Sequence, residues 1–199
     1  MDSFMTWGEF SALLIFASGA YYMLGIVSGE IKRPIMSTWF IWSIIGLIFL
    51  ISYYEAGAKM DTTLPAAWMG FINPLIIFAL TLKYGQKGWT RLDTWCIAVC
   101  AVGAISWQLS ESPIVGLLSA IVADSMGAIP QIRKSWTDPD DEPWFPWTCF
   151  CVGSGINILA LESWAPEHSL YPLYMTIGSV LICAPIVWRA FTRRIPATK

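Results

Sequence analysis

The stretch "SPIVGLLSAIVADSMGAIPQI", residues 112–132, carries a single charged side chain, that of Asp124. An uncharged run of about 17–25 residues is long enough to cross the hydrocarbon core of a bilayer as a helix. Outward from this stretch, the charged residues of the chain delimit six further runs of comparable length. These runs are 10–29, 34–54, 62–82, 94–110, 143–161 and 169–188. We therefore predict an all-α polytopic membrane protein with seven transmembrane helices.

The composition of the chain agrees with a membrane environment. Of the 199 residues, 56% are hydrophobic and 13% are charged, and the mean hydropathy is +0.57. Soluble domains are typically about 25% charged, so roughly half of the usual charge is missing. The seven runs cover nearly the whole chain, and we expect no separate soluble domain.

The positions of lysine and arginine predict the orientation of the helices, because loops on the cytoplasmic side are enriched in these residues. If the N-terminus is outside, the inner segments hold eleven of the twelve lysines and arginines, and the outer segments hold only Lys59. We predict an integral membrane protein with its N-terminus outside and its C-terminus in the cytoplasm. No basic run is long enough to indicate nucleic acid as a partner.

An internal repeat divides the chain. The sequence "WFIW" at 39–42 returns as "WFPW" at 144–147, an offset of 105, and Leu64-Pro65 matches Tyr171-Pro172 at an offset of 107. We predict a first triple-helix repeat at 1–88, a connector helix at 89–111 and a second triple-helix repeat at 112–199. Because the connector adds a single span, both repeats start on the same side of the membrane and have the same orientation. This is a 3+1+3 plan in which the halves are related by an axis along the membrane normal.

The pair Pro130-Gln131, followed by "IRKSW", resembles the signature of the PQ-loop superfamily, which includes the SWEET transporters. The "STWFIW" at 37–42 is similar to a group of bacterial integral membrane proteins, which implies a bacterial inner membrane. The resemblance implies transport of a small polar solute by alternating access between the two halves. The KDEL-receptor branch implies the alternative, a ligand-binding receptor or a membrane assembly subunit without transport.

Three departures from the family pattern limit what the resemblance carries over. Gly25 occupies the position equivalent to Pro130, and Val180 lies near the place where SWEETs have an asparagine. In this chain the tryptophans of the second and sixth predicted spans lie toward the inner ends, whereas the sugar-stacking tryptophans of SWEETs lie toward the outer ends; the four are Trp39, Trp42, Trp144 and Trp147. Sugar specificity is therefore not inherited.

Asp124 lies near the middle of its predicted span. A charged side chain at that depth is costly, so it usually faces a cavity, a partner or a proton path. We interpret Asp124 as a carboxylate that couples transport to protons or recognises a cationic group, a role that the aspartates of cystinosin-like relatives also suggest. The alternative is a protonated aspartate that is hydrogen-bonded between helices.

Prolines next to polar residues mark further candidates for the solute pathway. Pro130 removes a backbone donor and frees a carbonyl, so Pro130 and Gln131 are predicted to form a hinge and a polar lining at the inner mouth. A simple kinked helix end is the alternative. Asn73 and Pro74 are predicted to interrupt the third span in the same way. Asn157 is a weaker candidate, because the small residues before it favour helix packing.

Two tryptophan pairs complete the predicted site. Trp39 with Trp42, and Trp144 with Trp147, are spaced to share a helix face. They are predicted either to form two walls of an inner constriction, with Pro146 as a hinge, or to belong to an aromatic belt at the membrane interface. The acidic segment "DPDDE" at 138–142 is interpreted as a solvated turn, with partner binding as the alternative.

Other function classes fit the sequence poorly. The five cysteines fall inside the predicted spans and are interpreted as packing residues, so neither a metal nor a cofactor is predicted. No catalytic set of side chains occurs within the spans, and a retinal protein is excluded because the run 169–188 contains no lysine. The expected partners are the lipid bilayer and a small solute, and a homo-oligomer remains open.

Overall fold

The computed structural model describes residues 6–55, 64–86, 90–109, 113–161 and 164–193. Within these ranges the chain forms seven α-helices and two short 3-10 helices, and no β-strand. The α-helices are α1 (Trp7–Ser28), α2 (Met36–Glu55), α3 (Leu64–Tyr84), α4 (Arg91–Leu109), α5 (Pro113–Thr137), α6 (Trp144–Asn157) and α7 (Pro166–Thr192); the 3-10 helices are η1 (Pro139–Asp141) and η2 (Ile158–Ala160). Each predicted apolar run overlaps one α-helix, so the prediction of an all-α chain is confirmed for the described residues.

Two of the described helices are long and apolar enough to cross a membrane by length and composition. They are Trp7–Ser28 and the part Ser169–Thr192 of α7, each with a hydropathy of 1.8. These two helices are compatible with the membrane protein that the sequence predicts.

Local signals set both ends of α1. The Thr6 hydroxyl accepts a hydrogen bond from the Glu9 backbone N–H at 3.2 Å, and the Glu9 carboxylate accepts one from the Thr6 N–H at 2.8 Å. This capping box satisfies backbone donors that have no partner inside the helix. The helix ends at Gly29, whose φ of 80° is a left-handed conformation that glycine adopts without a Cβ clash.

The prolines of the sequence analysis occupy two kinds of position. Pro74 lies inside α3 and Pro130 lies inside α5, where each removes one backbone hydrogen bond. Pro146 lies in the first turn of α6, where its missing N–H leaves no intrahelical bond unmade. Pro74 and Pro130 therefore interrupt the hydrogen bonding of their helices, and Pro146 marks the start of one.

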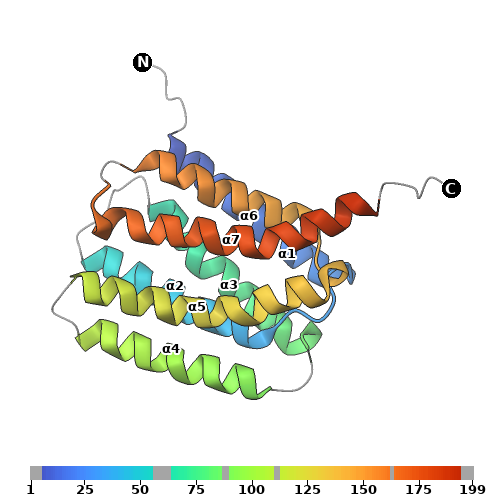
Figure 1. Ribbon diagram of the computed structural model, residues 1–199, viewed down its shortest axis with the longest axis horizontal. Helices are drawn as coiled ribbons and strands as arrows, with labels where there is room; N and C mark the ends of the chain where they lie inside the picture. The colour runs from blue at the N-terminus through green and yellow to red at the C-terminus, as the bar shows by residue number, and fades with distance from the viewer. Residues whose placement is uncertain (1–5, 56–63, 87–89, 110–112, 162–163, 194–199) are drawn as a thin grey trace.

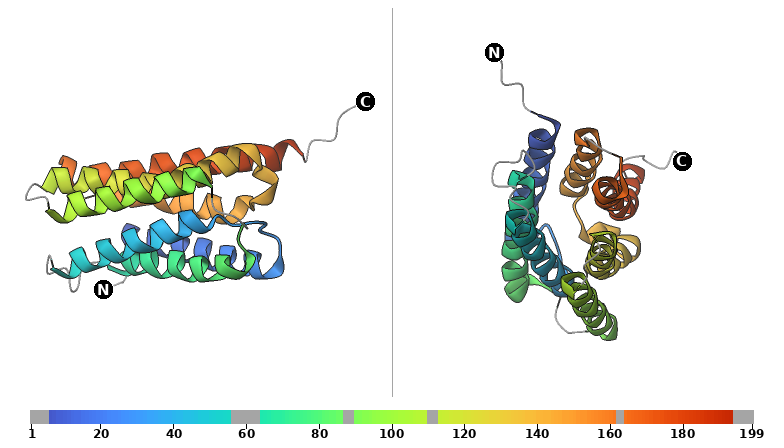
Figure 2. Two further views of the ribbon diagram at one scale, coloured as in Figure 1. Left: turned by 90° about the horizontal axis from the view of Figure 1, so that it is seen from below. Right: turned by 90° about the vertical axis from the view of Figure 1, so that its left-hand side faces the viewer.

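The helices form two layers (Figure 2). In one layer α3 contacts both α1 and α2, and in the other α7 contacts both α5 and α6. The layers meet along two seams, α1 against α6 and α2 against α5, and α4 packs mainly against α5. Successive helices run in opposite directions, so the start of α1 and the end of α7 lie at opposite ends of the bundle (Figure 1).

One end of the bundle, here named the basic end, is where α1, α3, α5 and α7 finish (Figure 1). Its described lysines and arginines are Lys32, Arg33, Lys83, Arg91, Arg133, Lys134, Arg189 and Arg193. The main core cluster of buried side chains joins α1, α2, α3, α6 and α7, and it includes Tyr22, Trp39 and Trp147. Two of the predicted constriction residues, Trp39 and Trp147, thus lie in this core, and Trp42 packs against it.

Candidate functional site

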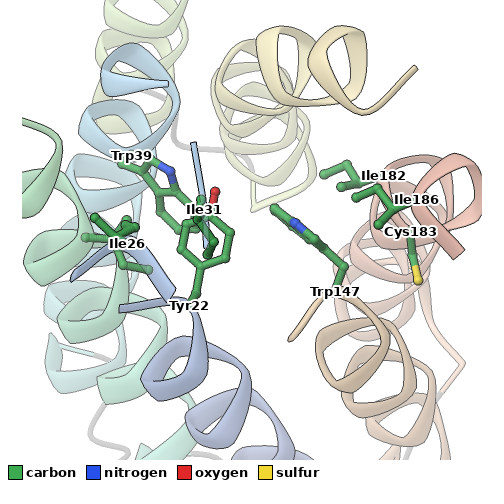
Figure 3. Close-up of a cluster of buried hydrophobic side chains, with 9 residues drawn as sticks. Tyr22, Ile26, Ile31, Trp39, Trp147, Ile182, Cys183 and Ile186 are labelled. Atoms are coloured by element: carbon green, nitrogen blue, oxygen red, sulfur yellow. The ribbon is translucent and has the colours of Figure 1, made fainter. Parts of the chain in front are cut away.

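Three aromatic rings meet where the two layers face each other (Figure 3). The Tyr22 ring of α1 lies 4.9 Å from the Trp39 ring of α2 and 5.7 Å from the Trp147 ring of α6, measured between centroids. Trp42 packs edge-on against Trp39 at 5.1 Å. The structure thus brings together three of the four predicted tryptophans and adds Tyr22, which the sequence pattern did not single out.

The fourth tryptophan, Trp144, lies apart from this cluster. Its ring packs against Phe145 at 5.8 Å and against Phe191 of α7 at 6.4 Å, and its side chain is partly exposed. The i, i+3 spacing placed Trp144 and Trp147 on one broad face of α6. Only the packing of the layers decides which of the two points inward.

A buried carboxylate, Glu142, lies beside the aromatic cluster. Its oxygens accept hydrogen bonds from Lys134 Nζ at 2.6 Å, from Trp147 Nε1 at 2.8 Å and from the Tyr22 hydroxyl at 3.2 Å. The side chains of Lys134 and Glu142 are 8% and 0% exposed. These three donors come from α5, α6 and α1, so one carboxylate connects both layers.

The rest of the acidic segment contacts the basic end. Asp141 pairs with Arg33, and Asp140 pairs with Arg189 and Arg193. The hydrogen bond from Arg33 to Asp141, together with the negative charge of the Asp141 carboxylate, raises the pKa of the Arg33 guanidinium. Asp138 and Asp140 are exposed, but Glu142 is buried and Asp141 is half-buried. The interpretation of 138–142 as a solvated turn is therefore wrong for its last two residues, because cations from other elements cover them.

Gln131 is fully buried, with 0% of its surface exposed. Among the described residues, neither its amide nitrogen nor its amide oxygen has a hydrogen-bond partner. The same holds for the buried Thr38 hydroxyl of α2, and the Trp39 indole N–H, which faces the Tyr22 hydroxyl, makes no hydrogen bond of good geometry. Buried polar atoms are usually paired, and leaving one unpaired costs about 1–3 kcal/mol, so this concentration is unusual.

The helix register places these groups at one level of the α2–α5 seam. A β-carbon on Gly127 would lie 2.8 Å from Trp42 Nε1 and 3.1 Å from Ile41 Cγ2, so Gly127 faces that part of α2. Since α2 and α5 run in opposite directions, one turn along α5 brings Gln131 level with Thr38. The next turn of α5 agrees with this alignment, because Lys134 Nζ donates a hydrogen bond at 2.7 Å to the carbonyl of Lys32, which lies just before α2.

Asp124 lies inside the second layer. It is 7% exposed, and its Oδ2 accepts a hydrogen bond from the Tyr174 hydroxyl of α7 at 2.7 Å. Ser125 donates in turn to the Tyr174 oxygen at 3.2 Å. Asp124 therefore has an interhelical partner, the arrangement expected under the structural alternative.

Asn73 lies inside the first layer. Its Nδ2 donates to the Ile15 carbonyl of α1 at 3.3 Å, and its side chain fills the space beside Gly19. Asn157 is half-buried at the last residue of α6, where the chain continues as η2. The predicted residues thus separate into three places: the seam with Trp39, Trp42, Gln131 and Trp147, the two layer interiors with Asn73 and Asp124, and the far end of α6 with Asn157.

Comparison with known proteins returned no matching family model, curated protein or solved structure.

Proposed function

We propose that the seven helices span a bilayer with the basic end in the cytoplasm. The distribution of side chains supports this proposal, because large apolar residues are exposed and polar ones are buried. Leu109 is 76% exposed and Val102 is 64% exposed, whereas Asn73, Gln131 and Glu142 are buried. Such an extensive apolar surface is rare on soluble monomers and is normal on a surface that faces lipid.

Exposed tryptophans at both ends of the bundle also favour a membrane. Trp136 and Trp188 are 61% and 74% exposed near the basic end, and Trp7 and Trp164 are 56% and 68% exposed near the other. Indole rings concentrate at the two headgroup levels of a bilayer. Two such levels at opposite ends of the helices are the spacing that a membrane-spanning bundle requires.

In this proposal the layers are two parallel triple-helix halves: the first half is α1, α2 and α3, the second half is α5, α6 and α7, and α4 is the connector. Matching contacts support the repeat. Tyr22 packs on Trp147. The offset of 105 relates Tyr22 to Gly127 and Trp42 to Trp147, and Gly127 and Trp42 also pack together. The third helix lies between the other two in both halves. An axis along the bundle would relate the two halves.

The proposed function is alternating-access transport of a small polar solute by a PQ-loop or SWEET-like carrier. The observation that carries it is the pair of unpartnered side chains Gln131 and Thr38 at the seam between the halves, with the Trp39 indole N–H beside them. These groups supply both donors and an acceptor. A polar solute passing between the halves would complete their hydrogen bonds, which a permanently closed interface leaves unmade.

The remaining predicted residues have supporting roles in this proposal. Pro74 and Pro130 let α3 and α5 bend, because each interrupts the backbone hydrogen bonding of its helix. Asp124 couples the movement to protons, and Asn73 lines the interior of the first half. The localisation that follows is the plasma membrane of a bacterium.

The proposal is tested with the purified full-length chain in lipid vesicles. Uptake of radiolabelled monosaccharides and of neutral and cationic amino acids is compared with uptake by empty vesicles. Saturable, protein-dependent uptake of at least one solute is expected. Stable binding of a solute or peptide without any flux would overturn the transport proposal and favour a receptor or an assembly subunit.

A further inference from the structure

The first and second halves are tied together at the basic end by a compact polar network, here named the latch: Lys134, Glu142, Tyr22, Trp147 and the Lys32 carbonyl. Two of its bonds cross between the halves. The Tyr22 hydroxyl donates to Glu142 at 3.2 Å, and Lys134 Nζ donates to the Lys32 carbonyl at 2.7 Å. The other two bonds of Glu142, to Lys134 and Trp147, lie within the second half.

The chemistry of the latch favours two discrete states over a gradual loosening. A buried ion pair is tolerable only while its remaining donors and acceptors are satisfied, since removing one partner leaves an uncompensated charge. In the closed state Glu142 accepts three hydrogen bonds and is shielded from solvent. If the halves separate, Lys134 and Glu142 lose the bonds to Lys32 and Tyr22 and must be hydrated by water instead. In a partly open latch, Lys134 and Glu142 would have neither all of their protein hydrogen bonds nor full hydration by water.

The loop that the latch holds is itself strained. Arg33 has a φ of 50°, a left-handed conformation unusual for a residue other than glycine, and Pro34 follows it directly. The second half holds this loop in place, because the Arg33 side chain pairs with Asp141 and the Lys32 N–H donates to the Asp141 carbonyl at 3.3 Å. Separation of the halves would release the strain.

The latch lies directly on the basic-end side of the unpartnered groups. Lys134 is one turn beyond Gln131 on α5, and Lys32 is in the loop that precedes Thr38. We propose that the latch is the inner gate, and that its rupture admits cytoplasmic water and solute to Gln131, Thr38 and Trp39. This inference rests on the proposed membrane function, in which the halves move apart at this end.

The test measures access to Thr38 in the detergent-solubilised full-length chain, with the five native cysteines replaced by alanine or serine. Thr38→Cys places a thiol at a site that is 0% exposed, and N-ethylmaleimide is the probe. Ser28→Cys, at an exposed position, reports general reactivity. Glu142→Gln is expected to raise the labelling rate of Thr38→Cys by about tenfold or more, because Lys134 then needs water.

Matched variants separate gating from a merely structural role. Asp140→Asn removes an exposed carboxylate from the same segment and is expected to leave the labelling rate within about twofold. Lys134→Met with Glu142→Leu replaces the pair by apolar side chains and is expected to keep Thr38→Cys protected. Glu142→Asp retains the charge but shortens the side chain, and an intermediate rate is expected; it decides the question if Glu142→Gln does not fold.

Labelling at the wild-type rate in a folded Glu142→Gln or Glu142→Asp protein would overturn the latch. That failure is distinct from failure of the transport proposal. Absence of solute flux from vesicles would contradict transport. A faster labelling of Thr38→Cys in the Glu142→Gln protein would still support the latch.

Discussion

The side chain of Asn73 occupies the space that a β-carbon on Gly19 would need: such a carbon would lie 2.4 Å from Asn73 Cγ. Asn73 also donates to the Ile15 carbonyl one turn earlier on α1. This contact fixes how closely α1 and α3 approach within the first half. It explains why glycine is required at position 19 for packing, although its backbone conformation is helical.

Gly19→Ala is therefore expected to destabilise the protein. The added methyl group forces Asn73 to move, and overpacking of this kind costs about 1–3 kcal/mol. The midpoint of thermal unfolding in detergent measures the effect. Gly155→Ala is the matched control, because a β-carbon there meets nothing within 4 Å. Adding Asn73→Ala to Gly19→Ala should recover part of the loss, and absence of any recovery would contradict the assigned contact.

Tyr174→Phe tests the partner of Asp124. The variant removes the hydroxyl that donates to Asp124 Oδ2 and leaves a buried carboxyl group without that donor. A loss of about 1–3 kcal/mol in the free energy of unfolding is expected. Tyr84→Phe, which alters a partly exposed tyrosine, should change stability by much less. Equal effects of the two variants would rule out a special role for the Tyr174 hydroxyl.

Asp124→Asn tests proton coupling. Within the described part of the chain, Tyr174 of α7 and Cys100 of α4 are titratable groups that interact with Asp124, and neither is a cation that would hold its charge permanently. We expect flux driven by an imposed pH gradient to lose that dependence in Asp124→Asn vesicles, while downhill exchange of the solute continues. Flux with unchanged pH dependence would show that Asp124 is a structural residue.

Reporters fused to the two termini test the orientation. A reporter that is active only in the cytoplasm is expected to work at the C-terminus and to fail at the N-terminus, because the proposed function gives the chain seven spans and places the basic end in the cytoplasm. Activity at both termini, or at neither, would contradict seven crossings.

The positions of the helices could be predicted from the sequence because charged residues bound each apolar run. The end of α5 could not: Arg133 and Lys134 were read as the edge of the span, but α5 continues to Thr137. Lys134 extends the buried helix because Glu142, eight residues later, neutralises it. That pairing depends on how the segment 138–142 folds back over the bundle, which no local pattern encodes.

The candidate site could be predicted in part, because a polar residue inside an apolar run is conspicuous. Gln131 stood out because a polar side chain follows a proline in an apolar run, and its burial agrees with that signal. Tyr22 and Glu142 did not stand out, since the hydrogen bond between them joins positions 120 residues apart in sequence. The presence of Lys134 one turn after Gln131, on the same face of α5, was a usable hint that a buried carboxylate lies nearby.

In the proposed function a polar solute passes the unpartnered groups at the α2–α5 seam. The most direct test is solute uptake by vesicles that contain Gln131→Leu, compared with Gln108→Leu, which makes the same change at an exposed position of α4. We expect Gln131→Leu to fold normally and to lose about tenfold or more of the uptake rate, with Gln108→Leu near wild type. Equal uptake by folded Gln131→Leu and wild-type protein would show that the solute does not pass Gln131.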